Sequence, residues 1–318
     1  MYPIKMMIRK RMLFGMLALL SGGIVQAAPG TFAPRELFRV SFGKGPDRLG
    51  ARLDGENLTA PRDFTMDGAG HFYLYDINKH RVARFSSEGR YEMEFRYPAT
   101  AGQLFAHADS HENLWLMISD PGQGMFYGVY DSRGRSLRSG IFSRFNHFRL
   151  HPDDDNVLHV ILSSDKDPRA TQTYLFDEKS LLMKREHIAR PPETHHQVRH
   201  KDRVYFIDQV PGSATSDSPP VNRVTDEAHH GVAELRGVVA YMTSMGEIYT
   251  RVGDREIRVY EADGSLKGKV VLEGLPSACA SVRFDADGNI YELDGIPDQA
   301  GQYTAEMPGM RLIRWERR

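Results

Sequence analysis

The stretch that decides the fold runs from Pro61 to Phe85 and reads PRDFTMDGAGHFYLYDINKHRVARF. Its polar turn at 67–70 (Asp-Gly-Ala-Gly) has a short run of apolar residues on each side. Glycine tolerates the positive φ angles of tight turns and aspartate caps the backbone locally, so this turn predicts a β-hairpin. A third short strand is expected over 81–85, where apolar and basic residues alternate before an aromatic.

One feature of this stretch recurs along the chain with a period of about 43 residues. Each copy has a polar turn, then an apolar residue, then an aromatic residue or histidine. The six copies are Phe72-Tyr73, Leu114-Trp115, Leu158-His159, Val204-Tyr205, Ile248-Tyr249 and Ile290-Tyr291. Their second residues are 42, 44, 46, 44 and 42 positions apart, which is the regularity of a repeat architecture.

The rest of each copy predicts a third strand and, after a second turn, a fourth, with no helical periodicity of useful length. Six four-stranded antiparallel units predict an all-β chain folded as a six-bladed β-propeller. The last unit ends after its third strand, whereas residues 35–43 precede the first unit and have no unit of their own. We expect this N-terminal strand to close the last blade as its fourth strand, in a single domain over 28–318.

The first unit carries a longer set of motif residues than the others. These are Pro61, Asp67, Gly70, Tyr73, Asp76, Asn78, Arg81 and Phe85. In this order they resemble an NHL repeat, and as architecture the resemblance covers residues 35–318. Related six-bladed propellers include metal-dependent lactonases, amidating lyases and esterases, which hold a metal ion in the central channel on His, Asp, Glu or Asn side chains. The resemblance therefore implies the propeller fold and leaves open whether the chain is an enzyme.

The first 27 residues have the pattern of a secretory signal peptide. Four basic residues within 5–11 precede an apolar run over 12–20, and Val-Gln-Ala ends at Ala27. A retained membrane anchor is the alternative, but the apolar run is too short to span a bilayer comfortably. Cleavage after Ala27 predicts a periplasmic or secreted protein without a transmembrane segment. It also changes the net charge from −1 to −5, because the leader has no acidic residue.

Composition excludes several other classes. The 318 residues contain 41 Lys plus Arg, 42 Asp plus Glu and one cysteine. A single cysteine excludes an intramolecular disulfide and a c-type haem attachment. The balanced charge argues against a nucleic-acid partner. The chain also lacks a Gly-x-Ser-x-Gly elbow, a phosphate-binding loop and a zinc-protease helix, so no catalytic motif is recognised.

Long connections are expected on one face of the propeller. Second-to-third-strand loops and blade connectors share this face, and the loops are long in four units. They span Met117 to Met125, Ser163 to Gln172, Gln209 to Asn222 and Gly295 to Gly309. Insertions on one face of a repeat protein are typical of a binding face, although drift in loop length is the alternative. The Pro/Ser-rich stretch 211–231 is expected to be a mobile loop, and the fourth unit shows no clear third strand.

The first strand of each blade lines the central channel, and polar residues on these strands are the candidate ligand-binding residues. They are Arg62, Asp63, His107, Arg149, His196, Tyr241 and Arg283. For a channel metal, zinc or calcium, the candidates are His107, His147 and His196. No two histidines have a spacing that is diagnostic of a metal site. The alternative is that they are hydrogen-bonded channel or rim residues.

Two function classes follow from these observations. The preferred one is a non-catalytic exported scaffold that binds a protein, peptide or glycan at the cell envelope through the looped face, because no catalytic motif is recognised. The alternative is a hydrolase or lyase that depends on a metal ion in the channel.

Overall fold

The computed structural model describes residues 30–317 with the exception of short segments. These are 55–56, 62, 98–102, 110, 121–123, 144, 146, 153–157, 164–171, 178–180, 187–194, 201–202, 211–218, 244, 254, 273–280, 286 and 300–306. The described chain is almost entirely β, with one short 3-10 helix, η1 (Ile77–Lys79). None of its helices is long and apolar enough to span a membrane.

Four separate sheets each contain four consecutive strands in chain order. The first consists of β4 (Phe64–Met66), β5 (Phe72–Asp76), β6 (Arg81–Phe85) and β7 (Tyr91–Arg96). The second consists of β8 (Gln103–Ala108), β9 (Leu114–Asp120), β10 (Gly124–Tyr130) and β11 (Ser136–Phe142). The third consists of β12 (His147–Pro152), β13 (Leu158–Ser163), β14 (Gln172–Asp177) and β15 (Leu182–Glu186). The fourth consists of β16 (His195–His200), β17 (Arg203–Gln209), β18 (Val221–Thr225) and β19 (Gly231–Arg236).

A fifth sheet has eight strands and contains both ends of the described chain. Its order is β20 (Val238–Met242), β21 (Ile248–Val252), β22 (Glu256–Tyr260), β23 (Leu266–Val271), β1 (Gly30–Ser41), β26 (Gly309–Arg317), β25 (Ile290–Gly295) and β24 (Ser281–Phe284). Strand β1 pairs antiparallel with β26 from Phe32 to Ser41, and its first two residues pair parallel with β23. The N-terminal strand, expected over 35–43, thus begins at Gly30 and lies beside the last strand. Strands β2 (Arg52–Asp54) and β3 (Asn57–Thr59) form a separate hairpin.

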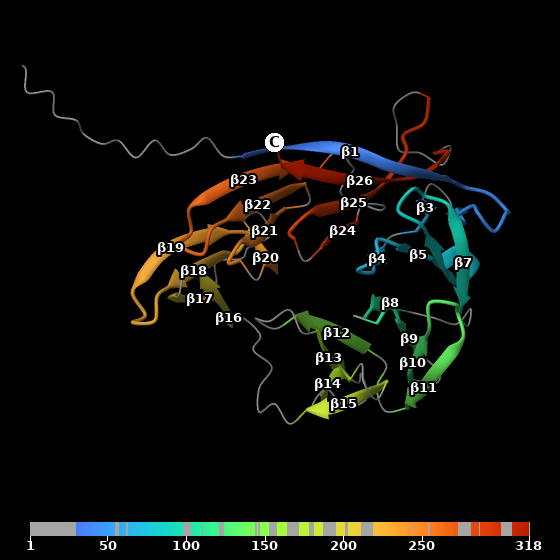
Figure 1. Ribbon diagram of the computed structural model, residues 1–318, viewed down its shortest axis with the longest axis horizontal. Helices are drawn as coiled ribbons and strands as arrows, with labels where there is room; N and C mark the ends of the chain where they lie inside the picture. The colour runs from blue at the N-terminus through green and yellow to red at the C-terminus, as the bar shows by residue number, and fades with distance from the viewer. Residues whose placement is uncertain are drawn as a thin grey trace, which may run out of the picture.

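The sheets are arranged around a common centre, as Figure 1 shows. The first strand of each four-strand set, such as β4, β8 and β12, lies nearest the centre, and β7, β11, β15 and β19 lie outside. The C-terminal end lies beside the beginning of β1. Residues more than 270 positions apart are therefore neighbours in one sheet, as in the pair Phe32 and Arg317.

The repeated aromatic residue has a structural partner in the turn that precedes it. Asp67 Oδ2 accepts a hydrogen bond from the Tyr73 hydroxyl at 2.9 Å, and Asp109 Oδ2 accepts one from Trp115 Nε1 at 2.9 Å. Asp285 Oδ2 accepts one from the Tyr291 hydroxyl at 3.1 Å. In each turn, the other carboxylate oxygen accepts backbone N–H groups two and four residues later. The aspartate thus closes the turn and positions the strand that follows, because both interactions span fixed sequence distances.

Other aromatic residues connect neighbouring sheets. The Tyr75 hydroxyl of the first sheet donates to Ala106 O at 2.6 Å and accepts from Ala106 N at 2.8 Å, and Ala106 belongs to the second sheet. The Tyr249 hydroxyl lies 2.9 Å from Gly288 O, which places β21 against the turn before β25. The hydroxyl groups of these tyrosines thus contact the backbone of a neighbouring strand set.

Part of the predicted mobile loop 211–231 is ordered in sheet pairing. Residues 221–225 form β18, which pairs with β17 and β19, so the expectation that the fourth unit lacks a clear third strand is wrong. Val224 is fully buried, and buried Asn222 donates from Nδ2 to Gly237 O at 2.6 Å. The strand has only five residues, and its two apolar residues, Val221 and Val224, are three positions apart, so it lacks the alternation by which a strand is recognised in the sequence.

A buried carboxylate fixes the last strand to the neighbouring strand set. Glu247, in the turn before β21, has a side chain only 3% exposed. It accepts two hydrogen bonds from Arg317, Nη1 to Oε1 and Nη2 to Oε2, both at 2.7 Å, and one from the Tyr249 hydroxyl at 3.0 Å. Lys267 Nζ lies 2.5 Å from Oε1. Burial raises the pKa of Glu247, but the hydrogen bonds from Arg317 and Lys267 outweigh burial and lower the pKa to about 2.

We expect Glu247→Gln to reduce the free energy of unfolding at pH 7 by about 2 kcal/mol. A pKa lowered from 4.5 to about 2 corresponds to roughly 3 kcal/mol, but Arg317 and Lys267 are each 38% exposed and therefore screened. Because the folded pKa lies below the unfolded one, this stabilisation is complete above pH 4.5 and declines as the pH falls towards 2. Urea denaturation at pH 7 and pH 3 measures both effects.

The matched control is Glu316→Gln, a carboxylate that is 40% exposed on the same last strand. It is expected to change stability by less than about 1 kcal/mol. If Glu247→Gln lost as much stability between pH 7 and pH 3 as the unaltered protein, Glu247 would not be the source of the acid sensitivity.

Candidate central site

Two of the predicted channel residues meet near the centre of the molecule. Asp63, just before β4, forms an ion pair with Arg283 on β24, from Arg283 Nη2 to Asp63 Oδ2. The Ser281 hydroxyl donates to Asp63 Oδ1 at 2.6 Å, and Arg283 Nε donates to Phe64 O at 3.0 Å. Asp63 and Arg283 are about one third exposed, at 32% and 35%. The group joins the first strands of the first and last strand sets with a partly solvated pair of opposite charges.

Tyr75 lies close to this group, whereas Tyr241 packs against Phe284, the residue after Arg283 on β24; both tyrosines have the surroundings of packed residues. Burial first, and then the charge of Asp63, raises the pKa of Tyr75, whose hydroxyl is bonded to Ala106. Tyr241, another predicted channel residue, stacks on Phe284 with ring centroids 5.1 Å apart and contacts Tyr249 edge-on at 6.0 Å. Burial also raises the pKa of Tyr241. Both phenols are therefore protonated at neutral pH and serve packing in the described structure.

The remaining candidates are spread over three first strands. His107 lies on β8 opposite Trp115, Arg149 lies on β12 opposite Ile161, and His196 lies on β16 opposite Ile207. Of Arg149, His147 and His196 the structure describes only the backbone, and Arg62 lies outside the described residues.

His107 occupies a different level from the other two candidate metal ligands. His107 pairs with Trp115, the repeat residue of its unit, whereas His147 and His196 lie four and two positions before the residues that pair with the equivalent repeat positions of their units. A strand advances about 3.3 Å per residue, so two to four positions correspond to roughly 7–13 Å. Among the residues that the structure describes, no three His, Cys, Asp or Glu side chains are grouped as metal ligands. The metal site stays a prediction.

A pocket of about 600 Å³ lies between the first sheet and the segment that follows β1. One wall is the connection between β5 and β6, which contains η1, and the other is the segment 42–52. The lining residues are Phe42, Gly43, Lys44, Gly50, Ala51, Arg52, Ile77, Asn78, Lys79 and His80. The pocket is therefore built from a second-to-third-strand connection and a connector, the elements that were expected to share the looped face.

Hydrogen bonds hold the two walls together. Gly50 N donates to both carboxylate oxygens of Asp76, at 3.0 and 3.1 Å. Asn78 Nδ2 donates to Gly50 O at 3.2 Å and to Thr59 O at 2.8 Å. Lys79 Nζ donates to Gly45 O at 2.8 Å and to Arg48 O at 2.6 Å. The connector is thus fixed by side chains of a single short connection, and the pocket has a defined shape.

A buried ion pair lies beneath this connector. Arg81 is 2% exposed and Asp76 fully buried, and Arg81 Nε donates to Asp76 Oδ2 at 3.1 Å. Arg81 Nη1 also donates to Pro46 O at 2.8 Å, and its Nη2 donates to Arg48 O. Burial raises the pKa of Asp76, while the hydrogen bond from Arg81 opposes this rise. Asp76, Asn78 and Arg81, which carried the NHL resemblance, hold the connector in place in this structure.

The basic residues of the pocket were not among the sequence-based candidates. Lys44 and Arg52 lie in a segment without repeat pattern. Lys79 and His80 lie within the first repeat unit, but neither was predicted to bind a ligand. The available signal was local: three basic residues, Lys44, Arg48 and Arg52, lie between the closing strand and the first unit.

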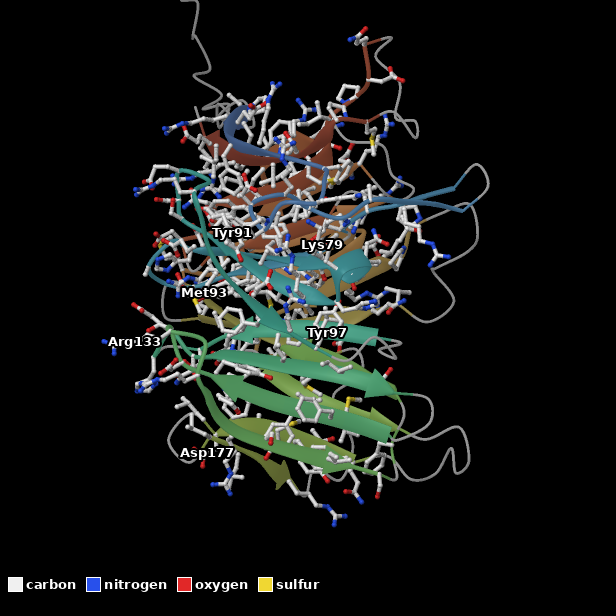
Figure 2. The ribbon with its side chains drawn as sticks, turned by 90° about the vertical axis from the view of Figure 1, so that its right-hand side faces the viewer. Lys79, Tyr91, Met93, Tyr97, Arg133 and Asp177 are labelled. Atoms are coloured by element: carbon white, nitrogen blue, oxygen red, sulfur yellow. The ribbon has the colours of Figure 1, made fainter. Side chains whose placement is uncertain are left out.

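The pocket and the tight turns lie on opposite faces. Figure 2 shows Lys79 and Tyr97 towards one side of the molecule, whereas Arg133 and Asp177, at turns between third and fourth strands, lie towards the other. The connection 77–80 that carries Lys79 therefore marks the face opposite the short turns, as the expected strand connectivity requires.

Several solved structures are similar to this chain over most of its length. The PQQ-bound aldose sugar dehydrogenase from Streptomyces coelicolor is similar with a TM-score of 0.50 and 11% identity, over 92% of this chain and 100% of that chain. A streptogramin B lyase has a TM-score of 0.45 and 9% identity, over 90% and 98% of the two chains. The calcium-binding protein regucalcin from Agrobacterium tumefaciens has a TM-score of 0.42 and 16% identity, over 91% and 96%.

No family model matches the chain, and no curated protein matches its sequence significantly. The class is defined by the radial sheets together with the first of these structural similarities: the chain is a β-propeller. At such low identity the similarity concerns the fold alone.

Proposed function

We propose that this β-propeller is an exported NHL-like binding scaffold that acts at the cell envelope. Its ligand, a protein, peptide or glycan, binds the face formed by the second-to-third-strand connections and the blade connectors. The pocket of about 600 Å³ between 42–52 and 77–80 is the observation that carries this proposal. Its volume lies within the roughly 300–1,000 Å³ range of ligand sites, and its walls are fixed by hydrogen bonds.

The proposal includes a ring of six four-stranded blades. The four separate sheets supply four blades, and the eight-stranded sheet divides into β20–β23 and a last blade of β24, β25, β26 and β1. The parallel contact between β1 and β23 covers only two residue pairs, whereas β1 pairs with β26 along most of its length, which supports this division. Closure by the N-terminal strand removes an exposed edge from the last blade.

Export is proposed from the basic and apolar leader that ends at Ala27. Strand β1 begins at Gly30, so cleavage after Ala27 removes no residue of the sheet. The mass and N-terminal sequence of the protein from the periplasmic and culture fractions measure both the cleavage position and the compartment.

The binding face is tested with the processed protein on peptide and glycan arrays. We expect the signals to disappear in Ala51→Trp, because Ala51 is exposed and lines the pocket, so an indole there fills it whatever the charge of the ligand. The matched control is Arg133→Trp at an exposed turn of the opposite face, which is expected to retain every signal. Signals that are unaffected by Ala51→Trp, or lost equally in both variants, would contradict the proposed face.

The same preparation decides the metal-dependent alternative. Stoichiometric zinc or calcium that is lost in His107→Ala or His196→Ala would overturn the scaffold proposal. A metal-free preparation whose melting temperature does not change when zinc or calcium is added would contradict the alternative function as a metal-dependent hydrolase or lyase.

A further inference from the structure

We infer that the pocket between 42–52 and 77–80 binds an organic anion of monosaccharide size through its carboxylate or phosphate group. This inference rests on the proposed function, since it gives the ligand chemistry of one part of the proposed binding face. It is carried by the charges that line the pocket, by the rigidity of its walls and by its size.

The lining of the pocket is positively charged. It contains Lys44, Arg52 and Lys79, with His80 at its edge, and no Asp or Glu is among the lining residues. Lys44 and Arg52 are exposed, and neither side chain has a hydrogen-bond or ion-pair partner within the described part of the chain. Cations without partners on one wall of a concave surface attract anions, because the recess concentrates the field.

Neighbouring carboxylates do not cancel this charge. Asp76 lies behind the wall, where Arg81 and the Gly50 amide neutralise it. Asp76, Glu94 and Asp47 attract the Lys79 ammonium, but none of these carboxylates is among the lining residues. Burial first, and then repulsion from Arg81, lowers the pKa of Lys79 in spite of this attraction.

The backbone of both pocket walls, 42–52 and 77–80, is held in place before a ligand binds. The Lys79 ammonium is fixed by two backbone carbonyls of the connector, and Asn78 fixes Gly50 next to Ala51 and Arg52. A ligand therefore does not have to order these backbone segments when it binds, which removes one of the usual entropic costs. Arg52 is the first residue of β2, and its planar guanidinium group can donate two parallel hydrogen bonds to a carboxylate or phosphate.

The size and the apolar part of the pocket indicate more than a bare ion. A volume of about 600 Å³ exceeds what one phosphate occupies and suits a small organic ligand. Phe42 and Ile77 are only partly buried and line the same space, so they offer apolar surface to a ring or a short carbon chain. A ligand with a compact carbon skeleton and one anionic group matches both parts.

Three probes that differ at a single carbon test this inference: glucose, glucuronate and glucose 6-phosphate. Binding to the processed protein is measured by calorimetry at low and at moderate salt. We expect one or both anionic sugars to bind and to weaken as salt increases, whereas glucose shows no saturable binding. Glucuronate and glucose 6-phosphate distinguish a carboxylate from a phosphate as the recognised group, and inorganic phosphate alone is expected to bind more weakly than a phosphorylated sugar.

Two neutral substitutions place the anion in the pocket. Arg52→Gln and Lys44→Gln are each expected to weaken binding by about tenfold or more, the usual effect of losing one charged hydrogen-bond donor. Both side chains are exposed, so melting temperatures should stay unchanged. Arg133→Gln on the opposite face is the matched control and should bind as the unaltered protein does.

The inference is overturned if neither anionic sugar binds, if glucose binds equally well, or if Arg52→Gln and Lys44→Gln bind with unchanged affinity. If Ala51→Trp still abolished the array signals, only the inferred anionic ligand would be wrong and the proposed binding face would remain supported. If Ala51→Trp left the array signals unchanged, the proposed function itself would be contradicted.

Discussion

Replacement of Phe38 by alanine is expected to reduce the free energy of unfolding by about 3–5 kcal/mol, the usual cost of truncating a buried phenylalanine. Phe38 lies on β1 and is 8% exposed. Its ring contacts Phe72 edge-on at 5.6 Å and stacks on Phe85 at 6.0 Å, and both partners belong to the first sheet. Phe38 therefore joins the N-terminal strand, which pairs with β26, to the sheet that begins the repeat.

This packing is tight on the side of the β6–β7 turn. Gly89 there has a φ of 79°, and a Cβ on it would lie 2.4 Å from the Phe38 ring. Truncation of Phe38 thus leaves a cavity that a fixed turn does not fill, which places the expected loss in the upper part of the range.

The control for Phe38→Ala is Arg39→Ala, on the same strand. The Arg39 side chain is 60% exposed and forms a surface ion pair with Glu36. Its removal is expected to leave the free energy of unfolding nearly unchanged, because solvent screens this ion pair. Equal losses for the two variants in urea denaturation would mean that β1 contributes through strand pairing alone and not through the core that it shares with the first sheet.

The second large effect is expected for Arg81→Met, which should destabilise the protein by about 3–5 kcal/mol because it leaves a buried carboxylate without its cation. Asp76 is fully buried, and after the substitution it retains hydrogen bonds only from the Gly50 amide among its described partners. The carbonyl oxygens of Pro46 and Arg48 also lose hydrogen bonds from Arg81. The connector should therefore loosen together with the global loss of stability.

Hydrogen exchange distinguishes this local effect from general destabilisation. The amides of Leu49 and Gly50, bonded to Ser41 O and to Asp76, should lose protection beyond the change in global stability. Arg96→Met is the control, because Arg96 is 77% exposed and shares Glu94 with Arg81. It should leave both the amides and the stability nearly unchanged. Protection at Leu49 and Gly50 that merely follows the global change would show that Arg81 does not hold the connector.

Much of the fold was predictable because it is encoded locally. The turn aspartate and the aromatic residue six positions later, as in Asp67 and Tyr73, interact over a fixed sequence distance. The repeat is thus visible wherever the pair is kept. The third strand of the fourth unit was not predicted, because β18 has only five residues. Its buried residues Asn222 and Val224 are recognised as buried only once the neighbouring segments are in place.

The central candidates were predicted one by one, but their partners were not. Asp63 and Arg283 were both named as channel residues, and they are 220 positions apart in the sequence. The sequence pattern contained no reason to pair them with each other. Their contact follows from the position of β24 beside β4, which depends on how all the sheets are placed around the centre.

The strand repeat and the N-terminal strand without a unit of its own could be recognised from the sequence, since each is a pattern of neighbouring residues; the export signal is a prediction from the same kind of pattern. That Lys44 and Arg52 line one pocket together with Lys79 could be seen only in the folded chain. These residues come together because β1 pairs with β26 and thereby carries the connector over η1, where Asp76, Asn78 and Arg81 hold it. A contact that depends on the pairing of the two ends of a chain has no local signature, because its partners are brought together only by folding.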